Sequence, residues 1–428
     1  MIQKLLKNKS LQVLTENFLS LFSLQAVGYI FPLITFPYLT QHLGLVGFGK
    51  YILIQTIFIY LDGIVSYGFK VTATDLVSKS SNKIEEVSSI FCSVLAVKLI
   101  LLLLVSILLC ISGFFIPFIK SNFILIIIGF PYLIGNFLFP VWLFQGMQRM
   151  KYITFIHVIA KVFFTCSIFL LVKDANDIIY AVGSYSFGVL LAGIFSIFIA
   201  YNMFSLKLYI PSLNLIREQF ISGYYVFLSQ FSVSMYSSAN ILILGALTSE
   251  MTVGIYAIAD KVYKMVTALA TPFSRALFPF MSQKFSSNSS RYKYIVLKTI
   301  MPLFGIFLMI GIMIFFSADL IVNFLLDSVE SSVQSVLALK ILSIGIPFFP
   351  FGAFFTYLLV IQNQKKELFK IVITIVGINL LIIFPFVHYF DVIGICITTI
   401  IVTVLVAGLK GRKVISFLSK RVEHKINR

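Results

Sequence analysis

The sequence predicts an all-α integral membrane protein, because its composition is unusually apolar and its apolar runs are long and unbroken. Hydrophobic residues make up 59% of the 428 residues and charged residues only 11%, whereas soluble globular chains carry about 25% charged residues. Apolar runs of about 20 residues, the length of a membrane-spanning helix, recur from end to end. Apolar and polar residues do not alternate within these runs, which favours helices over a β-barrel.

Twelve of the runs are long enough to cross a hydrocarbon core of about 30 Å as helices. Their approximate limits are 16–39, 50–72, 87–112, 122–145, 152–172, 178–203, 218–246, 253–280, 295–318, 333–360, 367–388 and 391–415. Prolines mark several spans, where each can kink its helix for movement or simply be tolerated by packing. They include Pro32, Pro37, Pro131, Pro140, Pro272, Pro279, Pro347 and Pro350.

Charges in the loops predict the orientation of the helices. With the N-terminus in the cytoplasm, alternate loops place most Lys and Arg residues on the cytoplasmic side, together with the basic tail. The opposite side receives only Lys50, Lys120 and Lys173 and most of the loop acids. This positive-inside pattern predicts that both termini are cytoplasmic. It also accounts for most of the net charge of +17, so we expect no nucleic-acid partner.

A weak internal repeat predicts two lobes of six helices around a central cavity. Leu43-Gly44 followed by Gly49-Lys50-Tyr51 recurs, six helices later, as Leu244-Gly245 followed by Gly254-Ile255-Tyr256. Parallel six-helix repeats are a transporter architecture, although chance recurrence of Gly and Tyr is the alternative. The expected parts are an N-terminal lobe over 1–205, a linker at 206–217 and a C-terminal lobe over 218–428 that includes the basic tail.

Ionisable residues inside the predicted spans are the candidate binding residues, since each costs about 2.5–3.5 kcal/mol at mid-bilayer. Asp62 and Lys98 lie at similar depth and could form a structural ion pair, and Asp260 and Lys264 are spaced to pair on one helix face. Cations that stay poorly compensated predict a hydrated cavity for an anionic substrate. These are Lys98, Lys161, Lys261 and Lys340. The full candidate set is Lys98, Lys161, Lys261, Lys264, Arg275 and Lys340, with Asp62 and Asp260 as structural or coupling acids.

Neutral oxygens in the C-terminal lobe form a second candidate site, for a coupling cation. Asn240, Asn379 and Thr398 or its neighbour Thr399 offer the hard oxygen ligands that sodium prefers. Hydrogen bonding between helices by buried Asn and Thr is the alternative. We expect coupling to a sodium or proton gradient, and neither a cofactor nor a metal centre, because the four cysteines are scattered with no CxxC spacing.

Four motifs resemble those of Wzx-type polysaccharide flippases of the multidrug/oligosaccharidyl-lipid/polysaccharide exporter superfamily. They are Phe36-Pro37-Tyr38-Leu39-Thr40-Gln41-His42-Leu43-Gly44 with Phe48-Gly49-Lys50-Tyr51, Tyr67-Gly68-Phe69 with Ala73-Thr74, Pro140-Val141-Trp142-Leu143-Phe144-Gln145-Gly146 with Met150-Lys151-Tyr152, and Ile243-Leu244-Gly245 with Val253-Gly254-Ile255-Tyr256. The chain departs from the family pattern at Asp75, where a basic residue is expected, and at Asn240, where relatives often carry Asp.

The resemblance implies a MATE-like fold and a transport function in the bacterial inner membrane. A flippase of this kind moves an oligosaccharide linked by diphosphate to undecaprenol, for O-antigen or capsule, by alternating access among membrane lipids. The polysaccharide polymerase is the expected protein partner. A drug/cation antiporter of the same superfamily is the alternative, although its cationic drugs need acids where this chain has a net cationic interior. An enzyme such as a glycosyltransferase would need a sizeable soluble domain, so no catalytic residues are expected.

Overall fold

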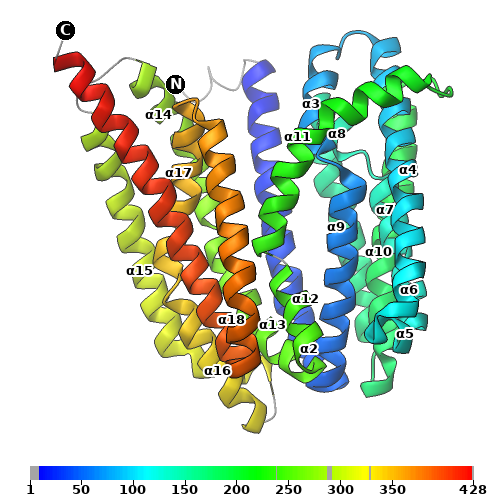
Figure 1. Ribbon diagram of the computed structural model, residues 1–428. Coiled ribbons are helices and arrows are strands. Elements are labelled where there is room, and N and C mark those ends of the chain that lie inside the picture. The colour runs from blue at the N-terminus through cyan, green and yellow to red at the C-terminus, as the bar shows by residue number, and fades with distance from the viewer. Residues whose placement is uncertain (1–8, 238, 287–291, 327–328, 427–428) are drawn as a thin grey trace. The chain divides into compact units, whose positions relative to one another are not determined.

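The computed structural model describes residues 9–237, 239–286, 292–326 and 329–426, and every regular element formed by these residues is a helix (Figure 1). The predicted all-α class is therefore confirmed. The chain divides into two units, Met1–Ser234 and Met235–Arg428. Each unit is described by itself below.

Unit 1 contains ten helices and one 3-10 turn among its described residues. They are α2 (Lys9–Ser66), α3 (Phe69–Lys79), α4 (Ile84–Phe115), α5 (Pro117–Ser121), α6 (Phe123–Gly129), α7 (Pro131–Leu138), α8 (Val141–Gly146), α9 (Met150–Leu171), η1 (Ala175–Asp177), α10 (Ile178–Phe204) and α11 (Leu213–Ser237), the last of which ends just beyond the unit boundary. Its core joins distant parts of the sequence, since Phe69, Phe91, Trp142 and Phe204 belong to one buried cluster.

The predicted turn between the first two spans lies inside α2. Gly44 has φ 66° and ψ 174°, so the backbone leaves the helical conformation between two helical stretches. A side chain at positive φ is strained, and glycine avoids that cost. Gly44 lies between the predicted spans 16–39 and 50–72, so the backbone breaks where the sequence predicts a turn.

Two prolines break the predicted span 122–145 into α6, α7 and α8. Pro131 opens α7, and Pro140 is the residue before α8. Proline cannot donate a backbone hydrogen bond, so a helix readily begins at it, although α2 continues through Pro32 and Pro37. In this span the prolines therefore divide the helix.

Glycines bring α7 and α10 into direct backbone contact. A methyl group built on Gly193 would lie 2.3 Å from the carbonyl oxygen of Gly135, and one on Gly135 would lie 2.4 Å from the carbonyl oxygen of Val189. Backbone atoms cannot move aside as a flexible side chain can. Small residues are the usual means by which membrane helices pack this closely.

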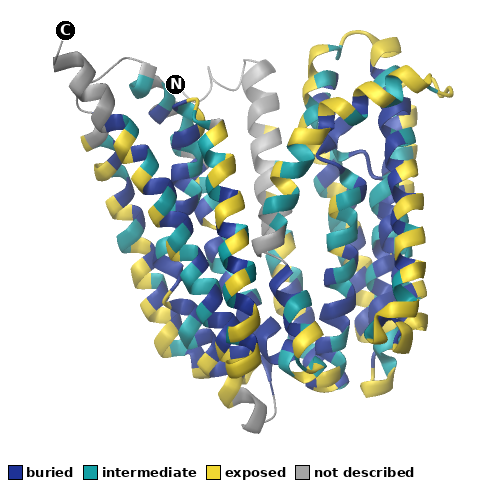
Figure 2. Cartoon of the chain, viewed as in Figure 1, coloured by how far each residue is buried: buried dark blue, intermediate teal, exposed yellow. Residues whose placement is uncertain are grey.

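Unit 2 contains seven helices and one 3-10 turn among its described residues. They are α12 (Ala239–Leu247), α13 (Glu250–Thr267), α14 (Ala270–Ser286), α15 (Tyr292–Leu325), α16 (Val329–Ser343), η2 (Ile346–Phe348), α17 (Phe349–Ile361) and α18 (Lys365–Ile426). Asp391, with φ 45° and ψ −121°, interrupts α18 at the predicted boundary between spans 367–388 and 391–415. Buried residues lie on the faces where helices of the unit meet (Figure 2).

Eight segments of the described residues are long and apolar enough to cross a membrane. They are Val27–Lys79, Ile84–Phe115, Phe123–Gly146, Met150–Leu171, Ala175–Phe204, Tyr294–Leu325, Val333–Ile361 and Lys366–Leu418. The first and last have 53 residues each and contain Gly44 and Asp391. A straight helix of that length would measure about 80 Å, far more than a hydrocarbon core of about 30 Å.

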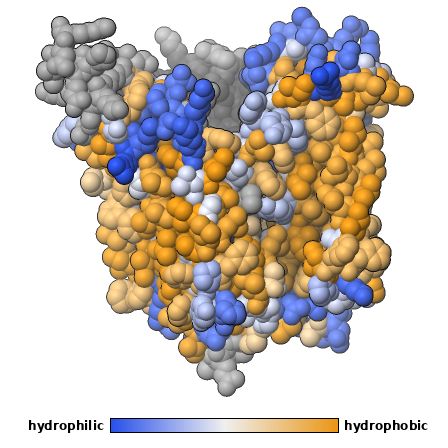
Figure 3. Space-filling model, in the orientation of Figure 1, coloured by the Kyte–Doolittle hydropathy of each residue, from blue (hydrophilic) through white to orange (hydrophobic). Residues whose placement is uncertain are grey.

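The surface of the units is that of a multi-pass membrane protein. On α4, Leu103 and Ile107 are 57% and 60% exposed. In Figure 3 hydrophobic residues dominate the middle of the visible faces and hydrophilic residues gather toward the ends. The count of twelve spans and the cytoplasmic position of both termini stay predictions.

The limits predicted for the two lobes also stay a prediction. The predicted linker at 206–217 covers the approach to α11 and its first residues, but α11 as far as Ser234 belongs to unit 1. Its aromatic residues pack there, since the Phe227 ring stacks on the Tyr67 ring at 4.8 Å and the Tyr67 hydroxyl donates to the carbonyl oxygen of Phe220.

Candidate functional site

Lys98 lies inside unit 1, where its ammonium group binds the end of a broken helix. It is on α4, is 3% exposed, and donates from Nζ to the carbonyl oxygens of Asn136 at 2.7 Å and Phe137 at 3.0 Å. These carbonyls belong to the last turn of α7, which ends before Pro140 and therefore leaves them without helical partners. A cation at this place also faces the negative end of the helix dipole. The contacts indicate a structural role for Lys98.

The possible ion pair between Asp62 and Lys98 does not form as a direct salt bridge. Asp62 accepts a hydrogen bond from the Ser66 hydroxyl one turn further along α2, at 3.2 Å. In the part of the chain that the structure describes, no salt bridge joins Asp62 to Lys98. Instead, the Lys98 ammonium donates two hydrogen bonds to the free carbonyl oxygens of α7. The similar depth of Asp62 and Lys98 in the sequence pattern could not predict these backbone partners.

Lys161, on α9, contacts a cluster of aromatic rings in unit 1. Its Nζ lies 5.4 Å from the centre of the Tyr185 ring and 5.7 Å from that of Phe164. Tyr185 in turn stacks on Tyr132 with ring centres 5.3 Å apart. Aromatic faces attract cations more strongly where water is excluded. This predicted substrate-binding cation therefore lies over a tyrosine-rich surface on α7, α9 and α10.

In unit 2 a chain of hydrogen bonds links three helices. Asn379 donates from Nδ2 to Oδ1 of Asn240 at 3.3 Å, and Asn240 donates to the Thr399 hydroxyl at 3.4 Å. The Tyr256 hydroxyl lies 3.4 Å from the Thr399 hydroxyl and donates to Oδ1 of Asp260 at 3.3 Å. We call these five residues the polar relay of unit 2.

The polar relay ends at a salt bridge. Asp260 and Lys264 pair at 2.7 Å, so the predicted pairing on one face of α13 is confirmed. The Asp260 side chain is 7% exposed and that of Lys264 42% exposed. The relay therefore connects the fully buried Asn379 with a half-exposed ammonium group.

Some oxygens of the candidate cation ligands take part in hydrogen bonds, and one does not. Asn379 is fully buried, and among the described residues its Oδ1 has no hydrogen-bond partner. Thr399 accepts from Asn240, whereas the Thr398 hydroxyl donates to the carbonyl oxygen of Gly394 at 2.9 Å. These contacts are the interhelical hydrogen bonds of the alternative interpretation. The unbonded oxygen of Asn379 is the feature that also suits a cation.

The remaining predicted cations have varied surroundings. The prediction that Lys340 is poorly compensated is wrong: it pairs at 2.8 Å with Asp319 on α15, which lies one residue beyond the predicted span 295–318. Lys261 is half-buried on α13, next to Asp260 in sequence. The side chain of Arg275 lies outside the described residues.

Sequence reasoning counted Lys410, at the end of the predicted span 391–415, with the basic tail and so missed a buried lysine. Lys410 is 5% exposed and donates from Nζ to the Thr356 hydroxyl of α17 at 2.9 Å. Lys410 lies in α18, which continues as a helix from Lys410 to Ile426. The neighbouring Gly411 was the available signal, since a methyl group built on it would lie 2.8 Å from the Phe355 ring of α17 and a charged tail seldom needs such close packing.

Comparisons with known proteins agree with the motifs and the helices. A family model described as polysaccharide biosynthesis protein matches residues 14–285, and a MatE model matches residues 226–387. A curated relative from Escherichia coli K12, provisionally named an O-antigen transporter, is 29% identical over 92% of this chain and 95% of its own.

Solved structures show the same fold at low sequence identity. The lipid II flippase MurJ, in an inward closed conformation, aligns with a TM-score of 0.75 at 16% identity over 96% of this chain and 90% of its own. An inward-facing MATE multidrug transporter aligns with a TM-score of 0.74 at 16% identity over 92% of this chain and 96% of its own. The fold is therefore MATE-like. The family model covers well over half of the residues, and the chain belongs to the polysaccharide biosynthesis protein family, in agreement with its Wzx-type motifs.

Proposed function

We propose that this chain is a flippase for undecaprenyl-diphosphate-linked oligosaccharide repeat units in the bacterial inner membrane. It would serve the synthesis of a surface polysaccharide, O-antigen or capsule, and hand its product to the polysaccharide polymerase. The observation that carries the proposal is the match to an O-antigen transporter along 92% of this chain. The relatives are transporters, and no step of the proposed function is catalytic.

The charge of the interior supports an anionic substrate. A diphosphate needs cationic hydrogen-bond donors, and the described spans hold more buried or half-buried lysines than acids. Lys161 is the candidate that we favour for the first test, because its ammonium lies over the rings of Tyr185 and Phe164 at the surface of a tyrosine cluster. Tyrosine rings also offer flat apolar faces on which a sugar can stack. The proposed mechanism is alternating access, with the prenyl tail left in lipid.

Deletion of the gene with lipid analysis is the test of the proposal. We expect undecaprenyl-diphosphate-linked repeat units to accumulate on the cytoplasmic leaflet and the surface polymer to disappear. Re-expression of this chain should restore both, whereas re-expression of an unrelated multi-pass protein at equal level should not. Normal surface polymer in the deletion strain would overturn the proposal.

A drug/cation antiporter is the second candidate, because the MatE model matches residues 226–387. An antiporter would need a carboxylate to hold a cationic drug. Asp260 is the buried acid in that region, and Lys264 already pairs with it at 2.7 Å. Increased drug sensitivity of the deletion strain, with unchanged polymer, would favour this candidate.

We further propose that a sodium ion binds beside Asn379 and couples transport to the sodium gradient. The fully buried Oδ1 of Asn379 and the neighbouring oxygens of Asn240 and Thr399 support this. Flipping by the purified chain in vesicles should then be faster with an imposed sodium gradient than with an equal potassium gradient. If flipping responds to the proton gradient alone, the sodium proposal is wrong, and Asp260 becomes the candidate for the residue that couples transport to protons.

A further inference from the structure

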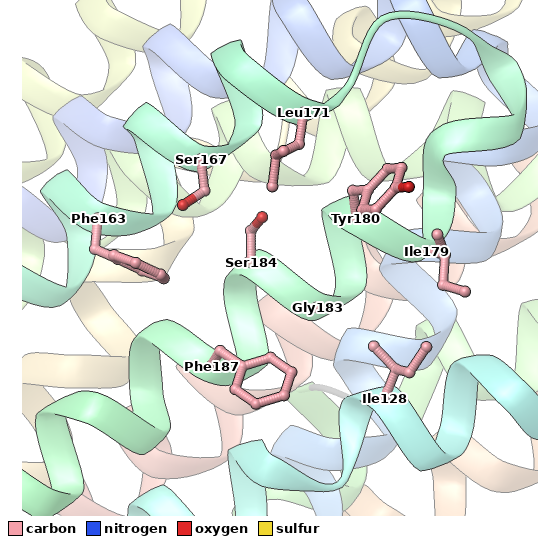
Figure 4. A pocket seen from close by; sticks show the side chains of 9 residues that line it. All are labelled: Ile128, Phe163, Ser167, Leu171, Ile179, Tyr180, Gly183, Ser184 and Phe187. Atoms are coloured by element: carbon pink, nitrogen blue, oxygen red, sulfur yellow. The ribbon is translucent and has the colours of Figure 1, made fainter.

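Unit 1 contains an open, mostly apolar groove that the proposed function does not use. It has a volume of about 400 Å³ and lies among α6, α9 and α10 (Figure 4). Apolar side chains such as Ile128, Phe163 and Phe187 form most of its wall. The two phenylalanines are 39% and 48% exposed, so the groove is open to the surroundings of a membrane-spanning unit.

Two serines are the exception to this apolar wall. Ser184 is 6% exposed, and its hydroxyl has no hydrogen-bond partner among the described residues. Other hydroxyls of this chain bond to the carbonyl four residues earlier, as Ser106 does to Leu102. Figure 4 shows Ser184 directing its hydroxyl into the space between α9 and α10, with Ser167 on the facing helix. A buried hydroxyl without a partner is unfavourable, so the site lacks a hydrogen-bonding group that an occupant would supply.

The lining residues follow a definite order along their helices. Tyr180 lies two residues into α10, about 3 Å below its start at Ile178. Ser167 lies about 6 Å before the end of α9 at Leu171, and Ser184 about 9 Å into α10. Phe163 and Phe187 lie deeper, about 12 and 14 Å from those helix ends. From the helix ends inward the groove therefore presents an amphipathic ring, then two hydroxyls, then two apolar rings.

A glycerophospholipid has the same order of groups along its length. Its headgroup lies at the border, its ester carbonyls lie just below, and its acyl chains fill the core. The carbonyl oxygens accept hydrogen bonds and could receive them from both serines. The prenyl tail of the proposed substrate is a plain hydrocarbon and offers no such acceptor.

Charges above the groove suit a zwitterionic headgroup. The connection between α9 and α10 carries Lys173, Asp174 and Asp177. Lys173 uses its Nζ to donate to the carbonyl oxygen of Phe169 at 2.6 Å, and an ammonium has two further protons for a phosphate. The Asp177 carboxylate accepts from the backbone of Lys173 and Asp174, and the Asp174 carboxylate accepts from the backbone of Asn176 and Asp177. Asp174 is exposed, and a carboxylate has about four lone-pair sites, so it can also accept from an ammonium group.

We propose that this groove is a specific binding site for one zwitterionic glycerophospholipid, with an ester carbonyl on Ser167 and Ser184 and the acyl chain over Phe163 and Phe187. The site lies in the leaflet that adjoins the connection between α9 and α10. The groove shares no lining residue with the ring contacts of Lys161, which are Phe164 and Tyr185, so the proposal does not depend on which substrate the chain transports.

Native mass spectrometry of the purified full chain in detergent tests the proposal. Diester phosphatidylethanolamine is compared with its diether analogue, which has the same shape and headgroup but no carbonyl oxygens. We expect the diester lipid to bind about tenfold more tightly, as one or two hydrogen bonds predict. The double variant Ser167→Ala, Ser184→Ala should bind both lipids equally, at the level of the diether lipid.

A blocking variant separates the groove from the rest of the surface. Ser184→Leu fills the groove and should abolish the first bound lipid, whereas the matched control Ser106→Leu on α4 should leave it in place. Equal binding of diester and diether lipids by the wild-type chain would overturn the proposal. Displacement of the bound lipid by undecaprenyl phosphate would also overturn the proposal. The same holds if the chain forms a dimer in which the groove is covered and binds no lipid. Transport need not be measured, so failure here would not bear on the proposed function.

Discussion

The substitution Lys98→Met tests whether the buried ammonium of unit 1 is structural. Methionine has a similar length and no donor, so the variant keeps the packing and loses the bonds to the carbonyl oxygens of Asn136 and Phe137, at 2.7 and 3.0 Å. We expect the variant to be less stable but, once folded, to transport normally.

The magnitude follows from the two bonds. A hydrogen bond from a charged donor contributes about 1.5–3 kcal/mol, so two contribute about 3–6 kcal/mol. The substitution also removes the cost of keeping an ammonium group 97% buried, which offsets part of that loss. We therefore expect the free energy of unfolding to fall by about 1–3 kcal/mol. The control Lys340→Met breaks a pair whose acid is 62% exposed, and it should cost at most about 1 kcal/mol.

Reversible denaturation in mixed micelles measures the stability, and surface polymer per molecule of folded protein measures transport. A structural Lys98 predicts lower stability with unchanged polymer per folded molecule. If Lys98→Met has wild-type stability and makes no polymer, the structural reasoning is refuted, and the predicted contact of Lys98 with the diphosphate gains support.

Three further predictions concern single side chains. Gly193→Ala should lower the free energy of unfolding by about 1–3 kcal/mol, because its methyl group would lie 2.3 Å from a backbone oxygen of Gly135; Gly113→Ala, with its nearest neighbour at 3.8 Å, should be neutral in the same denaturation assay. Lys161→Gln should reduce surface polymer about tenfold at equal protein level, and Lys120→Gln should not; equal polymer in both would exclude Lys161 from the path. Asn379→Leu should remove the sodium dependence of flipping in vesicles while the folded protein persists, and an unchanged sodium response would contradict the proposed cation site.

The fold was largely predictable because the features that set it are local. Continuous apolar runs predict helices, and Gly44, Pro131 and Pro140 mark breaks through their own backbone chemistry. Asp391 shows the limit, because nothing in its side chain requires the positive φ that it adopts. The boundary was predicted there from the end of an apolar run and not from the residue.

The candidate site was less predictable because its contacts depend on which helices are neighbours. Lys98 could be recognised as a costly charge, but its partners are backbone carbonyls, which have no signature in the sequence. Lys340 pairs with Asp319, which lies just beyond the predicted span 295–318, and Lys410, at the end of the predicted span 391–415, is buried although it was counted with the basic tail. Asp260 and Lys264 were predicted correctly because both belong to one helix.

The polar relay of unit 2 has fewer hydroxyl protons than hydroxyl contacts. The Tyr256 hydroxyl lies within bonding distance of Asp260 and Thr399, and the Thr399 hydroxyl also donates to the carbonyl oxygen of Ile395 at 2.8 Å. Two protons therefore serve three contacts. While Tyr256 donates to the carboxylate, Thr399 must choose between Ile395 and Tyr256. Its hydroxyl is a rotor with two positions, so a change of charge at Asp260 can reach Asn240 by reorientation of hydrogen bonds, without any movement of the backbone.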